Sequence, residues 1–358
     1  MRSVPERTYL RPTGFVDAPF GCDGQVARLA GGLAWFSAVE LNRGGETRLV
    51  AVADLHRHLD EESRLVWQRL TSARAPLRLG DRVVRLDQPQ VVGILNVTPD
   101  SFSDGGTHAD PVAAGQAMAA DGAAIVDVGG ESTRPGATPV WEGDECARVL
   151  PAAEGLARAG TAVSVDTRKA AVMRAALAAG AGLVNDVSAL TYDAEAAAVV
   201  AAAGCPVVLM HHQGSPETMQ QAPRYARPVL LEVYDWLETR IAAAEAAGIA
   251  RDRIIVDPGI GFGKTVAHNL QLLNGLALLH GLGCPIMLGA SRKRTIGALS
   301  NEAPPDRRLG GSLALALKGA EQGAQLLRVH DVFETVQALK VWRGLRDTAL
   351  TPPATLTR

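Results

Sequence analysis

Short apolar runs alternate with alanine-rich stretches along most of the chain, beginning near residue 89. The apolar runs are rich in Val, Ile and Leu, and they occupy residues 91–95, 123–128, 162–165, 182–185, 206–210, 253–257, 285–289 and 325–329. Continuously apolar segments of this length are typical of strands that are buried on both faces. The stretches between them, such as KAAVMRAALAAG (169–180), have the composition of helices, and glycine commonly closes each one.

This repeating order predicts the fold class. Strand alternating with helix about eight times over roughly 250 residues favours an α/β protein built as a parallel (β/α)8 TIM barrel. An open doubly wound sheet is the alternative. We expect the barrel to occupy residues 89–346, followed by a tail at 347–358. Residues 1–88 hold further strand-like and helix-like runs, which predict a small N-terminal α/β extension that braces the barrel or a dimer rather than carrying a second activity.

Composition and charge narrow the function classes. The chain has 36 basic and 38 acidic residues among 358, a net charge of −2, which argues against a protein that coats nucleic acid. No apolar run approaches the roughly 20 residues of a membrane span, and the first residues lack the apolar core of a secretion signal. We therefore expect a soluble cytoplasmic protein with neither a nucleic acid nor a membrane as partner. The four cysteines lie far apart, so neither a zinc site nor a disulfide framework is predicted.

A polar or charged residue follows nearly every apolar run. In chain order these residues are Asn96, Asp127, Asp166, Asn185, His211 after Met210, Asp257, Ser291 with Lys293, and Arg328 with His330. Any one of them could be an ordinary strand-end cap or turn former. Because the carboxyl ends of barrel strands share one rim, their convergence predicts a binding or catalytic site at that rim.

The residue types suggest the kind of ligand. Two carboxylates, an amide and an ammonium offer both acceptors and donors, which suits a flat heterocycle with amino, ring N–H and carbonyl edges. These groups belong to Asp166, Asp257, Asn185 and Lys293. Arg328 and His330 lie two positions apart on one side of a strand, and barrel closure brings them beside Asn96. They predict a separate phosphate-binding corner.

Two further motifs suggest a nucleotide site and a metal site, but their residues do not fit either one. PGIGFGKT (258–265) resembles a P-loop, but Pro258 stands where the P-loop needs glycine, and the glycines at 259, 261 and 263 do not fit the G-x-G-x-x-G spacing. Nucleotide hydrolysis and NAD binding therefore lose their main support. His211 and His212 are adjacent, so on a strand they point to opposite faces and are not expected to share one metal ion.

Eight segments of the chain, in one order, resemble the dihydropteroate synthases. They are GILNVTPDSFSDGG, DVGGESTRPGA, SVDTRK, VNDVS, VVLMHHQGSPETMQ, VDPGIGFGK, LGASRK and RVHDV, spread over residues 89 to about 345. The resemblance implies an enzyme of folate biosynthesis that condenses 6-hydroxymethyl-7,8-dihydropterin diphosphate with p-aminobenzoate to give 7,8-dihydropteroate and pyrophosphate. The alternatives are a pterin-dependent methyltransferase and a non-catalytic pterin-binding homologue, which would be expected to have lost Asn96, Arg328 or His330.

Carried over position by position, the resemblance implies roles for individual residues. The pterin diphosphate would be held by Thr133, Asp166, Asn185, Met210, Asp257, Phe262, Lys293, Arg328 and His330, and the catalytic residues among them would be Asp166, Lys293, Arg328 and His330. The p-aminobenzoate would contact Phe102, Thr133, Arg134, Pro135, Ser291 and Arg294. Asn96 would bind Mg2+ as the cofactor, and the protein would be a homodimer and a sulfonamide target.

One residue qualifies this assignment, and one segment adds to it. Arg294 stands where many members of the family carry a small residue, which leaves the affinity for p-aminobenzoate and for sulfonamides open. The VTPDSFSDGG segment is expected to be a flexible lid over the diphosphate, with Asp100 and Phe102 reaching inward.

Overall fold

The computed structural model describes residues 7–98, 110–132, 139–214 and 219–349. Eight parallel strands form one sheet in the order β12-β11-β10-β9-β8-β7-β14-β13, and a parallel bridge between Val256 and Ile286 joins its two outer strands. The strands are β7 (Gln90–Asn96), β8 (Ile125–Gly129), β9 (Val163–Asp166), β10 (Leu183–Asp186), β11 (Val207–Met210), β12 (Ile254–Asp257), β13 (Met287–Leu288) and β14 (Leu326–Val329). The predicted barrel is confirmed, and each of its strands overlaps one of the predicted apolar runs, extending beyond it by at most one residue at either end.

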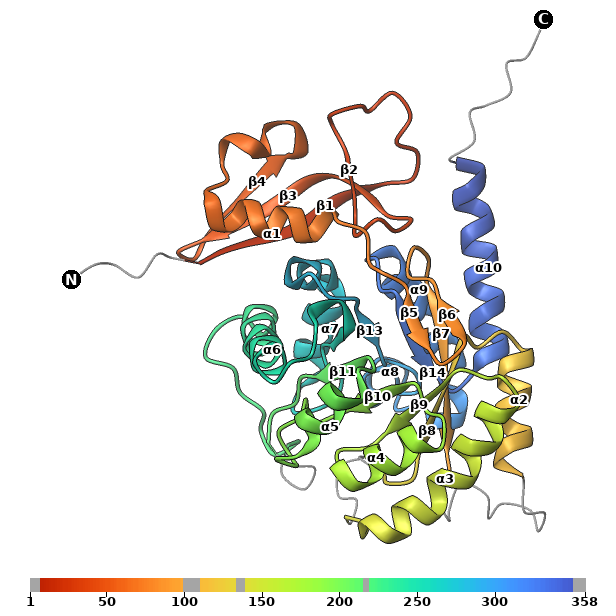
Figure 1. Cartoon of the computed structure of the whole chain (residues 1–358). Coiled ribbons are helices and arrows are strands. Elements are labelled where there is room, and N and C mark those ends of the chain that lie inside the picture. The colour runs from red at the N-terminus through yellow and green to blue at the C-terminus, as the bar shows by residue number, and fades with distance from the viewer. Residues whose placement is uncertain (1–6, 99–109, 133–138, 215–218, 350–358) are drawn as a thin grey trace, which may run out of the picture.

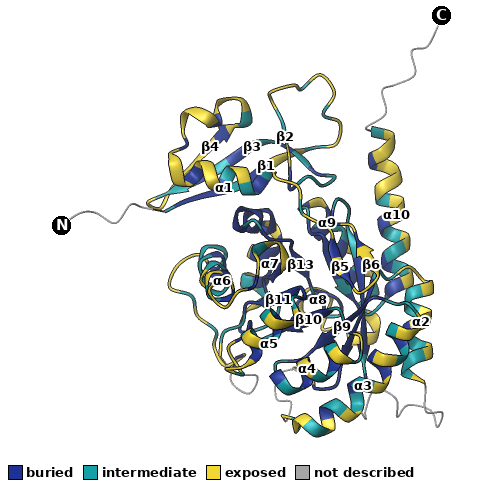
Figure 2. Ribbon diagram, in the orientation of Figure 1, coloured by how far each residue is buried: buried dark blue, intermediate teal, exposed yellow. Residues whose placement is uncertain are grey.

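Helices surround the barrel on its outer side (Figure 1). They are α2 (Pro111–Ala120), α3 (Glu142–Arg158), α4 (Ala170–Ala178), α5 (Ala196–Ala203), α6 (Val229–Ala246), α7 (Val266–Asn274), α8 (Arg294–Leu299), α9 (Leu309–Glu321) and α10 (Val332–Ala349), with short 3-10 turns η3 (Arg251–Arg253), η4 (Leu276–Leu282) and η5 (Pro305–Arg307). Figure 2 shows dark, buried strands inside a shell of helices whose outer faces are exposed. The last helix continues past residue 346 to Ala349.

Strand register brings the carboxyl ends of the strands to one level. Asn96 at the end of β7 lies opposite Gly129, which in turn lies opposite Asp166 on β9. Asp166 is then level with Asn185 on β10. Polar residues from separate parts of the chain therefore meet at one rim because parallel pairing aligns them.

A hairpin closes the opposite end of the barrel. It consists of β5 (Leu77–Leu79) and β6 (Arg82–Val84), which pair with each other in an antiparallel ladder. Leu77 and Leu79 are buried against apolar residues near the strand starts, and the cluster includes Val92, Ile125, Ala162, Leu183, Val208, Ile255, Met287 and Leu326. The hairpin therefore acts as an apolar floor beneath the barrel.

The N-terminal extension forms a separate layer over one end of the barrel (Figure 1). Its sheet contains β1 (Thr8–Val16), β2 (Ala27–Arg28), β3 (Trp35–Arg43) and β4 (Glu46–Ala51), and the 3-10 turn η1 (Val52–Arg57) and the helix α1 (Glu61–Thr71) follow. Its core contains Leu10, Phe36 and Leu70 together with Ala277 from η4 of the barrel. The extension therefore shares buried apolar surface with the barrel.

Candidate active site

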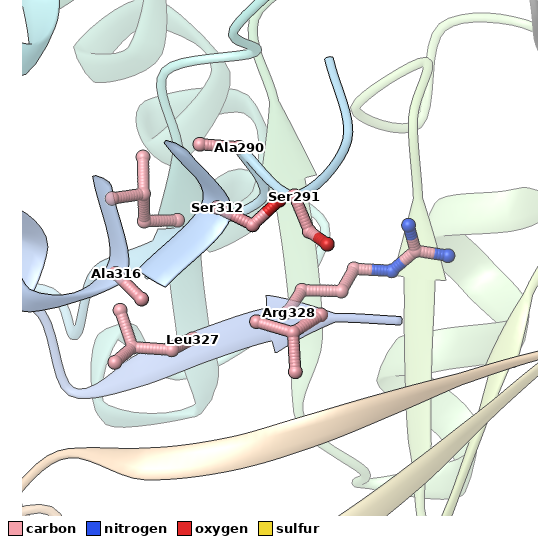
Figure 3. A pocket seen from close by; sticks show the side chains of 8 residues that line it. Ala290, Ser291, Ser312, Ala316, Leu327 and Arg328 are labelled. Carbon is pink, nitrogen blue, oxygen red and sulfur yellow. The ribbon is translucent and has the colours of Figure 1, made fainter. Parts of the chain in front are cut away.

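Arg328 joins the carboxylates of two neighbouring strands at the barrel rim. Its Nε donates to Asp127 Oδ2 at 2.6 Å, and its Nη2 donates to Asp166 Oδ2 at 2.7 Å. Figure 3 shows the side chain leaving β14 beside Ser291 and extending away from that strand. We expected Arg328 in a corner separate from the carboxylates, but its guanidinium binds two of them directly.

Asp127 lies at the centre of this cluster. Its side chain is buried, and its Oδ2 also accepts a hydrogen bond of 2.9 Å from Asn185 Nδ2. Asp127 was predicted to lie at the rim, but no part in binding or catalysis was predicted for it. The signal that could have identified it is a carboxylate inside an otherwise apolar strand, since a buried charge requires partners.

Two carboxylate oxygens of the cluster face no protein donor. Among the described residues, Asp127 Oδ1 and Asp166 Oδ1 are buried without a hydrogen-bond partner. Burial raises the pKa of Asp166 to about 7; Arg328 opposes this shift, and the negative charge of Asp127 adds to it. Buried acceptors without partners are expensive, so this arrangement suits a ligand that brings N–H groups.

Asp257 forms the next part of the rim. Its Oδ1 accepts a 2.7 Å hydrogen bond from the Gly259 amide, and burial raises its pKa although Lys293 and Arg328 oppose this. Gly259 has a φ of +65°, and a Cβ atom there would lie 1.9 Å from the carbonyl oxygen of His211. Only glycine fits at this position, so the turn that presents Asp257 requires it.

Aromatic and cationic side chains complete this side of the site. The Nζ of Lys293 lies 4.2 Å from the centroid of the Phe262 ring. Lys264, which is 3% exposed, places its Nζ 2.8 Å from His211 Nδ1 and donates to the Phe262 carbonyl at 2.9 Å. Burial lowers the pKa of Lys264 to about 7, although the charge of Asp257 opposes the shift. Neither the burial of Lys264 nor its contact with His211 was predicted.

The ends of β13 and β14 are tied together at the other side of the rim. Ser291 Oγ lies 3.1 Å from His330 Nδ1 and accepts a hydrogen bond of 3.2 Å from the His330 amide. Arg292, at a φ of +56°, forms an ion pair with Asp331. Met210 is buried beside Asp257, with which it is in register on the adjacent strand.

Some predicted residues cannot be placed at this rim. Phe102, Thr133, Arg134 and Pro135, together with Asp100 of the expected lid, lie outside the described residues. Arg294 is exposed at the start of α8. Glu131, the first residue of the ESTRPG segment, accepts from the Val140 amide at 2.8 Å and pairs with Arg168 and Lys169, each at 3.1 Å. This buried ion cluster fixes both ends of the loop and was not predicted.

The described residues limit how a metal could bind. They contain no group of three or more His, Cys, Asp or Glu side chains placed to hold an ion. Asn96 Oδ1 nevertheless faces the rim, 3.8 Å from where a Cβ atom of Gly129 would stand and thus beside Asp166. An amide oxygen is a hard donor of the kind that Mg2+ accepts alongside phosphate and water. Within the same described ranges, no helix has the length and apolar character needed to cross a bilayer.

Comparison with known proteins identifies the family. The sequence signature of the family described as pterin binding enzyme matches residues 92–330. The dihydropteroate synthase of Escherichia coli (strain K12) is 50% identical over 262 residues, which are 72% of this chain and 91% of that protein. The Xanthomonas albilineans dihydropteroate synthase solved with 4-aminobenzoic acid is 50% identical, with a TM-score of 0.72, and the match covers 76% of this chain and 99% of that one. The same enzyme in complex with 7,8-dihydropteroate gives 47% identity, a TM-score of 0.69 and coverage of 76% and 98%.

The fold and the site together define a pterin-binding barrel enzyme. A closed (β/α)8 barrel places carboxylates, an amide and two cations at the carboxyl ends of its strands, and the matched region spans all of these strand ends. The chain belongs to the pterin binding enzymes, and within them to the family of dihydropteroate synthases.

Proposed function

We propose that this chain catalyses the condensation of 6-hydroxymethyl-7,8-dihydropterin diphosphate with p-aminobenzoate to give 7,8-dihydropteroate and pyrophosphate. The observation that carries the proposal is the hydrogen-bonded cluster of Arg328, Asp127, Asp166 and Asn185 at the barrel rim. The match to the dihydropteroate synthase of Escherichia coli covers 91% of that protein, so the similarity is not limited to one segment. A methyltransferase or a non-catalytic homologue is not favoured, because Asn96, Arg328 and His330 are all present.

The carboxylates would hold the pterin ring. Asp166 and Asp257 accept hydrogen bonds from the ring N–H and amino groups, and the ammonium of Lys293 donates to the ring carbonyl. The buried, unpartnered oxygen of Asp166 supports this assignment, because a bound donor would satisfy it. The Phe262 ring beside Lys293 supplies a flat apolar surface for stacking.

The reaction replaces one bond to the pterin methylene carbon with another. The amine nitrogen of p-aminobenzoate forms a C–N bond, the C–O bond to the diphosphate breaks, and the amine loses one proton. Positive charge develops on the methylene and negative charge on the departing group. Carboxylates near the ring stabilise the first, while Arg328 and His330 donate to the second. Each charge-assisted contact to the departing diphosphate is worth about 1.5–3 kcal/mol, so a few such contacts together could change the rate by several powers of ten.

Asn96 would hold Mg2+ with the diphosphate and water as its other ligands. When bound, the ion supplies positive charge beside the diphosphate oxygens. The support for this assignment is the position of the Asn96 oxygen at the rim and the chemistry of an amide donor. All other steps rest on the side chains already named.

We also propose that the protein works in the cytoplasm as a homodimer. The four cysteines are free, which suits a reducing compartment. Phe333, Val341 and Leu345 are 55%, 61% and 70% exposed along one face of α10, a pattern that suits contact with a second copy. Light scattering after gel filtration, on the native chain and on Leu345→Glu, tests the dimer: the variant should elute as a monomer.

A direct assay tests the function. Purified protein is incubated with the pterin diphosphate, p-aminobenzoate and Mg2+, and both pyrophosphate and dihydropteroate are quantified. Dihydropteroate should appear only when both substrates and Mg2+ are present, and it should fall to background in Arg328→Ala. Arg48→Ala, which removes an exposed ion pair with Glu46 in the extension, is the matched control and should keep full activity. Binding of the pterin diphosphate without any dihydropteroate would identify a non-catalytic homologue instead.

A further inference from the structure

The N-terminal extension contacts the barrel through a tyrosine and an arginine that share one carboxylate. Tyr9 on β1 donates from its hydroxyl to Asp235 on α6, at 3.0 Å and 2.9 Å from the two carboxylate oxygens. Arg227, which immediately precedes the turn into α6, donates to Asp235 at 2.6 Å and to the Tyr9 hydroxyl at 3.4 Å. The extension is therefore bonded both to α6 and to the segment that leads into it.

Aromatic packing holds this contact in one geometry. The rings of Tyr9 and Tyr234 meet edge to face, with centroids 5.6 Å apart. The guanidinium of Arg7 lies 4.9 Å from the centroid of the Tyr234 ring and pairs with Asp235 at 2.8 Å. Tyr9 is 6% exposed and Tyr234 is 2% exposed, so water does not separate the two layers there.

The segment that carries Arg227 also supports the glycine-rich turn of the site. Tyr225, two residues before Arg227, donates its hydroxyl to the Gly263 carbonyl at 2.9 Å. Gln220 donates to the Gly261 carbonyl at 2.5 Å. These two carbonyls flank Phe262, whose ring lies against Lys293.

This turn needs support from outside itself. Gly259, Gly261 and Gly263 all have positive φ, at +65°, +85° and +65°. Glycine loses more conformational freedom on folding than other residues, so a turn built on three of them holds one shape only if other groups bind it. The hydrogen bonds from Tyr225 and Gln220 reach the carbonyls of two of these three glycines.

We propose that the N-terminal extension is a brace for the pterin side of the site. It acts through Tyr9, Asp235 and Arg227, which fix residues 219–228, and through Tyr225, which fixes the turn that presents Phe262. Tyr9, Arg227 and Tyr225 are positioning residues that touch no substrate. The proposal rests on the proposed function only in naming the pterin diphosphate as the ligand whose binding the brace improves.

Tyr9→Phe tests the brace with the smallest change. It removes the hydroxyl but keeps the ring on Tyr234, so the extension should still fold. In the protein without substrate, hydrogen exchange of peptides covering residues 258–264 should become several-fold faster. The KM for the pterin diphosphate should rise about three- to tenfold, which corresponds to less than the full energy of a hydrogen bond to a charged group, because the lost bond acts on the site indirectly. The KM for p-aminobenzoate and kcat should each stay within about twofold.

Arg43→Met is the matched control inside the extension. Arg43 donates to Thr8 at 2.7 Å and to Asp60 at 2.8 Å, and its remaining partner, His58, is also in the extension. The Arg43→Met variant should lower the melting temperature at least as much as Tyr9→Phe does. It should leave hydrogen exchange at residues 258–264 and the KM for the pterin diphosphate unchanged. Tyr225→Phe combined with Tyr9→Phe should raise the pterin KM no further than Tyr225→Phe alone, because both variants release the same turn.

The outcomes separate this proposal from the proposed function. Unchanged exchange at 258–264 in Tyr9→Phe overturns the brace, as does an equal effect on exchange and KM in Arg43→Met. If the wild-type protein makes no dihydropteroate, the proposed function fails, and the exchange comparison, which uses no substrate, still decides for or against the brace.

Discussion

Arg328 on β14 pairs with Asp166 on β9 at 2.7 Å although β7 and β8 lie between their strands in the sheet. The long side chain crosses the mouth of the barrel and passes Asp127, to which it donates at 2.6 Å. One cation therefore binds two buried carboxylates. Under the proposed function, Arg328 would link the ring side of the site to the leaving-group side, where charges of opposite sign develop.

Arg328→Lys should be much less active than its retained charge suggests. A lysine is a point charge with no planar fork, so it cannot bridge Asp127 and Asp166 together. Loss of one charge-assisted hydrogen bond of about 1.5–3 kcal/mol should lower kcat/KM for the pterin diphosphate by about 10- to 100-fold. Steady-state kinetics measure this, with the exposed Arg48→Lys as control. Activity within twofold of wild type would show that the bridge is dispensable.

The activity should depend on the ionisation of Asp166. Its pKa is raised to about 7, so below that pH it carries a proton and loses its capacity as an acceptor for the ring N–H groups. The kcat/KM for the pterin diphosphate should therefore fall as the pH drops through about 7 and level off above it. In Asp127→Asn, one neighbouring negative charge is gone, so the midpoint should move to lower pH, while the distant, exposed Asp252→Asn should leave it in place. A midpoint that does not move in Asp127→Asn contradicts this account.

Lys264 should make the stability of the protein rise with pH. In the unfolded chain a lysine has a pKa near 10.4, whereas in the folded protein that of Lys264 is lowered to about 7. Between these values the unfolded state binds the proton that the folded state has lost, so the free energy of unfolding increases with pH in this range. The full effect is on the order of 5 kcal/mol.

Lys264→Met removes this titration and should flatten the curve. Urea unfolding at pH 7, 8 and 9 should show the difference in unfolding free energy between Lys264→Met and wild type moving steadily in favour of wild type. Lys340→Gln, exposed on α10, should run parallel to wild type. Parallel curves for Lys264→Met as well would mean that Lys264 has an ordinary pKa in the folded protein.

The barrel could be predicted because its strands are uninterrupted apolar runs separated by alanine-rich helices. Strand β1 could not, since Pro12 and Gly14 lie inside it and both disfavour strands. It persists because β1 lies at the edge of its sheet and pairs with β3 alone, where a missing amide donor is tolerated. Tertiary pairing thus overrode a local signal.

The residues of the site could be predicted where they end a strand, but their partners could not. Asp166, Asn185 and Asp257 follow from the rule that strand ends share a rim. The bond between Arg328 and Asp127 depends on a side-chain conformation that no spacing in the sequence specifies. The burial of Lys264 could not be predicted for a related reason. It arises from the tight turn at Gly259, which brings the ammonium against His211, and no pattern of residues in the sequence specifies that contact.

Glu131, the first residue of the ESTRPG segment, should both stabilise the protein and hold the loop that it begins. The Glu131 side chain is 3% exposed and is bound by Arg168, Lys169 and the Val140 amide, which lies on the far side of the loop. Burial pushes the pKa of Glu131 upward, but these donors outweigh it and leave the pKa below its ordinary value. Glu131→Gln keeps the shape but leaves two buried cations with less negative charge, so it should destabilise the protein by about 3 kcal/mol.

Urea unfolding at pH 7 measures that loss. The matched control is Glu154→Gln on α3, whose pair with Arg158 is exposed, and it should change stability by less than about 0.5 kcal/mol. Because the Glu131 contacts also fix both ends of the loop, the KM for p-aminobenzoate should rise more than that for the pterin diphosphate. Equal increases in both KM values would assign Glu131 to general stability alone, since loosening of this one loop should affect the two substrates unequally.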